Sequence, residues 1–146
     1  MIVEIKRVII DEPSDIEEFN NDIYGISESG IEIHIETSEN VSELEHYINK
    51  KVDILLFINH LVIDALKEFL KNGYPLYEGE LLGKFKIESE WKHTYDYRKI
   101  HLIGIGTQEG ILLTSKWACD REKIKIGEKI KFTTYSYNIV AWSPIE

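Results

Sequence analysis

The segment 91–98 holds three aromatic residues, two cations, a histidine and an aspartate. On a β-barrel, exposed aromatic rings beside Lys or Arg can stack on the bases of single-stranded nucleic acid and neutralise its phosphates. The candidate ligand-binding residues on this interpretation are Trp91, Tyr95, Tyr97, Arg98, Tyr135 and Tyr137. The competing interpretation places Trp91 and one tyrosine in the core, with the cations keeping a hairpin soluble. We favour this second interpretation because Lys and Arg do not clearly outnumber Asp and Glu in the second half of the chain.

Two histidines have spacings that could serve metal binding. Glu32, His34 and Glu36 alternate along an expected strand, so their side chains share one face and could hold a divalent cation. His60 and Asp64 are four residues apart at the start of an expected helix. We interpret the first set as a solvated polar face. We interpret the second as part of a first helical turn, because one histidine and one carboxylate supply only half of a typical ligand set. No metal site is assigned.

The sequence contains no recognisable catalytic motif. Cys119 is the only cysteine, which excludes an internal disulfide and a cysteine-based zinc cage. No histidine is close to it in sequence, so we interpret it as a buried or spare thiol. Neither a Gly-x-Ser-x-Gly elbow nor a glycine-rich phosphate loop occurs. We therefore expect a protein that is not an enzyme, with no catalytic residue and no cofactor.

The charge is concentrated in the first half of the chain. Residues 1–73 carry 6 Lys or Arg against 16 Asp or Glu, whereas residues 74–146 carry 11 against 10. Such a balance argues against duplex DNA as a ligand, because phosphate neutralisation needs clustered cations. An acidic surface can steer a basic protein partner, and the residues expected to do so are Glu17, Glu18, Glu43 and Glu45. The competing interpretation is an acidic surface that serves only solubility.

The first half is expected to alternate strands and helices. Capping-box patterns at Ser14 and Ser42 predict helix starts, and Gly73 stands where a helix would end. The helix over 61–72 has the clearest apolar stripe, and the one over 14–23 carries many carboxylates, Asp22 among them. The expected strands are 2–10, 31–36 and 52–58, and the expected helices are 14–23, 42–48 and 61–72.

The second half is expected to consist almost entirely of strands. Alternation and turn residues predict strands over 85–91, 100–105, 110–115, 130–132 and 140–142. Five short strands in this length favour a small antiparallel barrel or sandwich. Three strands, a short helix and further strands also form the order of an OB-fold. Segments 27–31 and 107–111 resemble each other, as do 47–54 and 125–132, which is compatible with a duplicated small barrel as well as with two unrelated meanders.

These observations predict a β-rich α+β protein: an acidic strand-and-helix unit over 1–73 and a five-stranded antiparallel, OB-like barrel unit over 74–146, or one continuous domain. The expected function is a small interaction protein that binds a basic partner through its acidic N-terminal surface. The alternative is a single-stranded nucleic-acid or small-ligand binding module that uses the C-terminal aromatics. A homodimer that forms through an unpaired edge strand of the barrel is also compatible with the sequence. No targeting or membrane-spanning segment is recognised, so the expected location is the cytoplasm.

Overall fold

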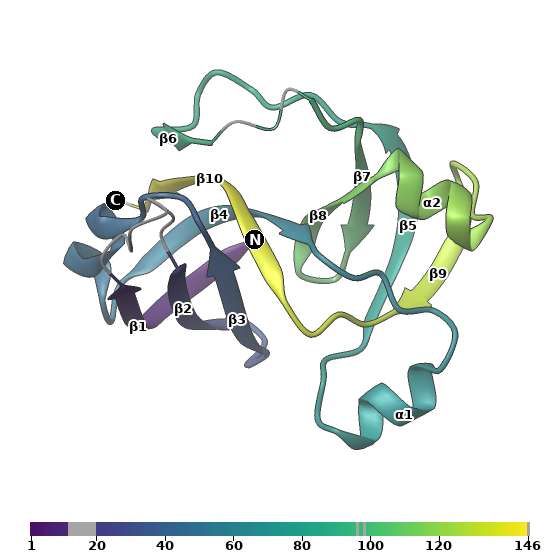
Figure 1. The fold of residues 1–146 in the computed structure, drawn as a ribbon, viewed down its shortest axis with the longest axis horizontal. Helices are drawn as coiled ribbons and strands as arrows, with labels where there is room; N and C mark the ends of the chain where they lie inside the picture. The colour runs from purple at the N-terminus through teal and green to yellow at the C-terminus, as the bar shows by residue number, and fades with distance from the viewer. Residues whose placement is uncertain (12–19, 96, 98, 146) are drawn as a thin grey trace.

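The structure is a computed structural model, which describes residues 1–11, 20–95, 97 and 99–145. The described part of the chain contains ten strands and three short helices (Figure 1). In the first half these are β1 (Ile2–Asp11), β2 (Asn20–Ser27), β3 (Glu32–Thr37), the 3-10 helix η1 (Ser42–Tyr47), β4 (Lys51–Ile58) and α1 (Leu66–Lys71). In the second half they are β5 (Tyr77–Lys84), β6 (His93–Thr94), β7 (Leu102–Thr107), β8 (Gly110–Ser115), α2 (Lys116–Glu122), β9 (Lys129–Phe132) and β10 (Tyr137–Pro144).

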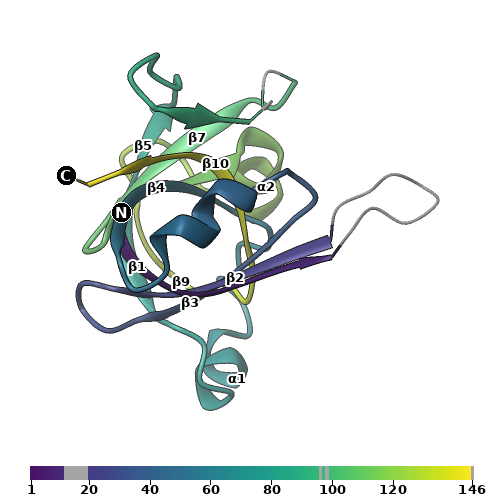
Figure 2. The same cartoon turned by 90° about the vertical axis from the view of Figure 1, so that its left-hand side faces the viewer.

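Five strands close into a barrel in the order β1, β2, β3, β10, β4 and back to β1. Strands β3 and β10 run parallel and the other neighbours run antiparallel, so the barrel is mixed. Figure 2 looks into the barrel, with the blue η1 lying across its near end. Leu44 of η1 is fully buried and covers the apolar interior there.

The expected β-rich fold with a five-stranded barrel is confirmed at this level. The strands that close the barrel differ from those expected, because four come from the first half and only β10 comes from the second. The barrel is also mixed rather than antiparallel. Alternate residues of its strands form the core, as period-2 patterns require. The inward side chains include Val3, Ile5, Ile23, Ile33, Ile35, Ile54, Leu56 and Ile139.

A second group of strands lies beside the barrel (Figure 1). Strand β5 pairs with β9 and β7, and β7 pairs with β8, all antiparallel. Strand β8 in turn lies parallel to the end of β4, at Leu56 and Phe57. The predicted hairpin over 100–115, the short helix near 42–48 and the strand at 130–132 are confirmed.

Three expected elements are wrong in whole or in part. The helix over 61–72 is reduced to α1, because Val62 instead pairs with Thr133 in an isolated bridge and Ala65 is left-handed with φ 61°. The helix over 14–23 is wrong at its end, where Ile23 is buried inside β2; residues 12–19 lie outside the described residues. No strand occupies 85–91, since the pairing with β7 and β9 uses 77–84 instead.

None of the helices in the described ranges has both the length and the apolar character needed to cross a membrane.

Candidate functional site

The outer face of β2 and β3 carries polar and aromatic side chains. The antiparallel register places Asp22 opposite Glu36 and Tyr24 opposite His34. The residues between them point into the barrel and are buried. Because strand residues alternate between faces, these four side chains all project outward on one side of the sheet.

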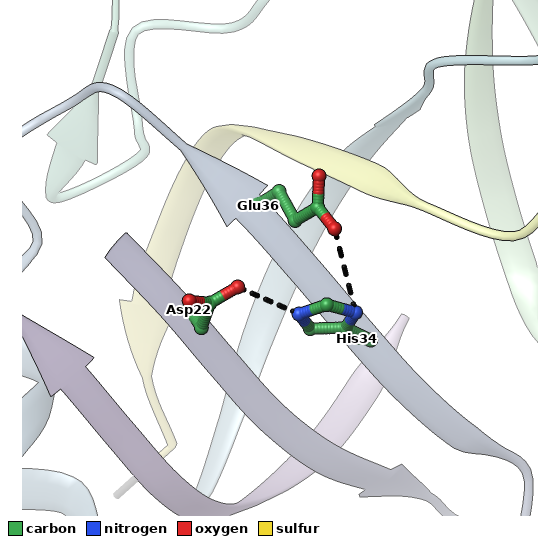
Figure 3. A group of neighbouring side chains, drawn as sticks. All are labelled: Asp22, His34 and Glu36. Carbon is green, nitrogen blue, oxygen red and sulfur yellow. Dashed lines mark hydrogen bonds and ion pairs between the residues drawn. The ribbon is translucent and has the colours of Figure 1, made fainter. Parts of the chain in front are cut away.

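His34 lies between two carboxylates on this face (Figure 3). Its Nε2 is 2.8 Å from Asp22 Oδ1, and its Nδ1 is 3.8 Å from Glu36 Oε1. The imidazole stacks on Tyr24, with ring centroids 4.5 Å apart and planes inclined by 1°. The stack fixes the plane of the imidazole, so both ring nitrogens stay directed along the sheet toward the carboxylates.

The same face forms one wall of a groove of about 630 Å³. The rest of the lining comes from the segment 72–75, which lies between α1 and β5, and from Thr134, Tyr135 and Tyr137, just before and at the start of β10. Its most prominent side chains are aromatic or acidic: Tyr24, Glu32, His34, Glu36, Tyr74 and Tyr135. Among the described residues, Lys6 is the one lysine or arginine that lines the groove, and its ammonium group already pairs with the carboxylate of Glu4.

Tyr135 is the centre of an aromatic cluster in this second part of the lining. Its ring stacks on His60 at 4.4 Å between centroids and on Phe69 at 5.7 Å. Tyr74 lies 6.0 Å from Tyr135 and completes the cluster. The cluster attaches α1 to the segment before β10 and gives the groove a wall of ring faces.

The aromatic residues singled out in the sequence occupy different environments. Tyr97 and Tyr137 are buried, whereas Tyr135 is half-exposed in the groove. Trp91, Tyr95 and Tyr97 line a separate depression, and Arg98 lies outside the described residues. The structure therefore does not bring the described members of this set together on one surface.

Carboxylates lie near Tyr95 and Tyr97. Burial raises the pKa of Tyr95 above its usual value, and the charges of Glu39 and Glu43 raise it further. Burial and Glu39 likewise raise the pKa of Tyr97. The hydroxyl of Tyr95 accepts a hydrogen bond from Trp142 Nε1 at 3.2 Å and donates one to a backbone carbonyl, so it is engaged within the protein. The described lining of this depression contains one lysine, Lys86, and one carboxylate, Glu88, so it offers a phosphate no excess of cations.

The residues expected to form the acidic surface are only partly described. Glu43 and Glu45 are exposed on η1, and Glu17 and Glu18 lie outside the described residues. Asp22, which the sequence pattern assigns to an acidic helix, lies instead in β2 beside His34. The charge of Glu43 raises the pKa of Tyr95, and Glu43 is not among the described residues that line the groove.

The remaining candidate residues, Cys119 and His60, are packed against other parts of the protein. Cys119 is buried in the core, and burial together with Asp120 raises the pKa of its thiol, which disfavours the nucleophilic thiolate. His60 stacks on Tyr135, and the helix it was expected to open begins only at Leu66. Asn59 pairs with Ser136, with 2.9 Å between its Nδ2 and the serine Oγ.

Sequence patterns identified part of this site and missed the rest. The shared face of Glu32, His34 and Glu36 follows from strand alternation. Asp22, Tyr24 and Tyr74 were missed, although alternation of Ile23 with its neighbours is a strand signal that could have placed the first two. Among the described residues, Asp22, His34 and Glu36 form the one group of three side chains with ligand atoms close enough for a metal ion. Comparison with protein-family models, curated proteins and solved structures finds no match for this chain.

Proposed function

We propose that the protein is a non-enzymatic binding module that docks a basic segment of a protein partner in the groove beside β2 and β3. The observation that carries this proposal is the lining of the groove, which combines ring faces with carboxylates. The partner would be basic, as the acidic first half of the chain predicts, and the groove would be its contact site on that acidic surface.

The lining favours a lysine or arginine side chain for two reasons. A cation over an aromatic ring is attracted by the ring quadrupole, worth about 0.5–1 kcal/mol at an exposed site. Tyr24, Tyr74 and Tyr135 line the groove and are each slightly more than one-third exposed, and Tyr74 has no parallel-stacked partner among the described aromatic pairs. Glu32 and Glu36 can then accept hydrogen bonds from the charged head group.

The charge of the first half of the chain also favours a positively charged partner. Residues 1–73 contain 16 acidic against 6 basic residues, so the potential around the barrel attracts cations before contact. Glu43 and Glu45 are exposed and contribute to that potential. Steering of this kind raises the association rate more than the strength of the final contact.

We also propose that the barrel is OB-like. In support, three strands, a short helix and a fourth strand precede the closing strand β10, which is the strand order of an OB-fold. OB-folds bind ligands on the face of their second and third strands. By analogy with that fold alone, the outer face of β2 and β3 is the expected binding surface here.

The two halves are proposed to be a duplication of one small barrel. The β-bulge of β1 lies between Ile5 and Arg7, and that of β5 lies between Leu81 and Gly83, 76 residues later in each case. Apart from the two-residue β6, the second half has the order β5, β7, β8, α2 and β9, which repeats the order β1, β2, β3, η1 and β4 of the first half.

Matching hydrogen bonds also support a duplication. The N–H of Asn49 donates to the carbonyl of Ile5 at 2.6 Å, and the N–H of Gly127 donates to the carbonyl of Leu81 at 2.7 Å. Both donors have positive φ, 66° and 87° respectively. Each donor stands just before the strand that pairs with the bulged strand.

The segments that leave the two repeats cross and pair with each other. Val62 and Thr133 exchange backbone hydrogen bonds of 3.0 Å, and the N–H of Asn59 donates to the carbonyl of Ser136 at 3.2 Å. After this crossing, β10 closes the barrel of the first repeat. The end of β4, which precedes the crossing in the first repeat, lies parallel to β8 of the second repeat. Such reciprocal placement is expected when two repeats exchange their last strands.

The alternative, single-stranded nucleic acid on the C-terminal aromatics, has weaker support. Trp91 and Tyr95 line the second depression, but Glu39 and Glu43 act on the tyrosine there. Two other members of that set, Tyr97 and Tyr137, are buried. Base stacking needs exposed rings and a backbone-tracking positive groove.

The test is a titration followed by amide NMR shifts, with EDTA present throughout. The probe is the capped peptide Gly-Lys-Gly-Lys-Gly-Lys-Gly, with the matching glutamate peptide and a thymidine oligonucleotide as the other arms. We expect the lysine peptide to shift amides of β2, β3 and residues 72–75 and 134–137. The substitutions Glu32→Gln and Glu36→Gln should weaken binding, whereas Glu43→Gln should change it little.

Shifts confined to other surfaces, or equal responses to the lysine and glutamate peptides, would contradict the groove as a docking site. A response to the oligonucleotide at Trp91 and Tyr95, without a response to the lysine peptide, would support the alternative instead.

A further inference from the structure

We propose that Asp22, His34 and Glu36 form a binding site for a divalent transition-metal ion of the Zn²⁺ class. The site lies on the outer face of β2 and β3, at one wall of the groove (Figure 3). The proposal rests on these three side chains and does not depend on a protein partner.

The ligand atoms are already close together. One oxygen or nitrogen from each of the three side chains lies within 4.8 Å of those of the other two. The strand register causes this proximity, since Asp22 is directly opposite Glu36, and His34 is two residues from Glu36 on the same face. All three belong to paired strands of the closed barrel, which hold the ligand backbones more firmly than a loop would.

Asp22 Oδ1 and His34 Nε2 are close to the separation of two ligands of one ion. Bonds of about 2.0–2.2 Å at tetrahedral angles place adjacent ligand atoms roughly 3.3–3.6 Å apart, so these two atoms, 2.8 Å apart at hydrogen-bond distance, need to separate by less than about 1 Å. A single ion can take only one nitrogen of the ring, and Glu36 Oε1 lies 3.8 Å from the other, Nδ1. The Glu36 side chain is 56% exposed, so it has room to rotate toward the ion.

The stacked Tyr24 ring assists this arrangement. With planes inclined by 1° and centroids 4.5 Å apart, it restrains the rotation of the imidazole. Where Glu36 moves closer to Nδ1, from the present 3.8 Å, it can accept a hydrogen bond from Nδ1–H, and Nε2 then carries no proton and can bind the ion beside Asp22. Either position of Glu36 leaves coordination positions open toward the groove for water or a further ligand.

The charges of the site are unbalanced without a cation. Like charges directly opposite each other on neighbouring strands are destabilising, and Asp22 faces Glu36 in this way. Within the described ranges, the ion pairs of these two carboxylates involve His34 and no lysine or arginine. A divalent ion would neutralise both carboxylates while binding neutral imidazole, whereas a protonated His34 would offset only one of the two negative charges. These two alternatives predict different responses to added metal.

The donor set selects among metals. One imidazole and two carboxylates suit Zn²⁺ and neighbouring transition metals, whereas Mg²⁺ prefers oxygen ligands and retains its waters. We therefore expect ZnCl₂ to bind where MgCl₂ at the same concentration does not. The sequence spacing raised Glu32, His34 and Glu36 as a possible set and favoured a solvated polar face, whereas the structure brings the ligand atoms of Asp22, His34 and Glu36 together.

The experiment is isothermal titration of the full chain, stripped with EDTA and dialysed, with ZnCl₂ and separately with MgCl₂. We expect one Zn²⁺ to bind per chain. The substitution His34→Gln should weaken the affinity for this ion about 10–100-fold, and Asp22→Asn should also reduce it. His60→Gln and Glu32→Gln are the controls, because Glu32 lines the groove and His60 stacks on Tyr135 while both lie outside the ligand set, and neither should change the affinity more than slightly. Thermal unfolding of each apo variant checks that it is folded, and added ZnCl₂ should raise the Tm of the unsubstituted chain but not that of His34→Gln.

Long-range ¹⁵N NMR of the imidazoles provides a second readout. On addition of ZnCl₂, the Nε2 resonance of His34 should shift while those of His60 and His93 do not. The proposal is overturned if the chain binds no Zn²⁺, if His34→Gln binds it as tightly as the unsubstituted chain, or if other histidines shift instead.

Discussion

The hydroxyl groups of Tyr77 and Tyr137 lie 2.5 Å apart in the core, and the two side chains are 0% and 2% exposed. Tyr77 is the first residue of β5, and Tyr137 is the first residue of β10. Because β10 closes the barrel while β5 belongs to the neighbouring strands, this hydrogen bond links the two parts of the fold. A buried hydroxyl without a partner is costly, so the two tyrosines depend on each other.

We predict that Tyr77→Phe and Tyr137→Phe each lower the free energy of unfolding by about 1–3 kcal/mol, since each leaves a buried hydroxyl without this partner. The double variant should lose less than the sum of the single losses, because neither hydroxyl then remains. Urea denaturation measures all three. Tyr135→Phe is the control, since that side chain is 38% exposed and its hydroxyl should contribute little. Strictly additive losses would contradict the coupling.

The same pair predicts loss of stability at high pH. Burial raises the pKa of Tyr77 to about 12 and also raises the pKa of Tyr137. The unfolded chain releases these protons near pH 10, before the folded chain does. The free energy of unfolding should therefore be unaffected by these groups below pH 10 and should fall as the pH rises from about 10 toward 12.

Urea denaturation at a series of pH values measures this decline, and absorbance at 295 nm follows the ionisation. The decline should be shallower in the Tyr77→Phe/Tyr137→Phe variant. An equally steep decline in that variant would assign the effect to other groups.

Local patterns predicted many strands but not how they close. The alternation of Ile31, Ile33 and Ile35 identified β3, and the apolar run at 52–58 identified β4. Strand β5 was missed because its glycines, Gly79 and Gly83, dilute the pattern. Closure of the barrel depends on pairing between β10 and strands far away in sequence, and no local pattern encodes that partner choice.

The helix over 61–72 shows how tertiary contacts override a local pattern. Its apolar residues have helical spacing, but Val62 is used for the bridge to Thr133 and Ala65 is left-handed. Only the last part of the expected helix forms, and its face packs through Phe69 on Tyr135. Intrinsic helix preference is weak enough for one pairing to reverse it.

The candidate site was predictable to the extent that it lies within one strand. His34 and Glu36 share a face because they are two residues apart on β3. Asp22 comes from a neighbouring strand, and Tyr74 and Tyr135 come from segments that the fold brings to the same groove. Those positions depend on register and on chain crossing, which composition and spacing do not specify.

We predict that Cys119 reacts slowly with thiol reagents while the protein is folded. Its side chain is buried, and burial and Asp120 raise the pKa of the thiol, so little thiolate is accessible near neutral pH. Absorbance after mixing with a disulfide reagent at pH 7.5 measures the rate, and the chain in urea is the control. We expect the folded protein to react at least about tenfold more slowly. Equal rates would show that α2 opens readily.

We predict that charge reversal at Glu17, Glu18, Glu43 and Glu45 together slows association with the lysine peptide more than it speeds dissociation. All four add to the negative charge of the first half, and the two described ones, Glu43 and Glu45, are not among the residues that line the groove. Stopped-flow tyrosine and tryptophan fluorescence at two salt concentrations measures both rates. The association rate of the unsubstituted chain should fall with added NaCl, and that of the variant should fall less. A change confined to the dissociation rate would place these carboxylates in direct contact with the peptide.

The last prediction concerns the aromatic wall of the groove. Tyr135→Ala removes the ring that stacks on His60 and Phe69 and faces the groove. We expect it to weaken binding of the lysine peptide about 2–5-fold, because Tyr74 packs beside Tyr135 and loses its position for one cation–π contact at an exposed site. Trp117→Ala is the matched control, because Trp117 is 69% exposed on α2 and is not part of the groove lining. If both substitutions weakened binding equally, general aromatic adhesion rather than the groove would account for the affinity.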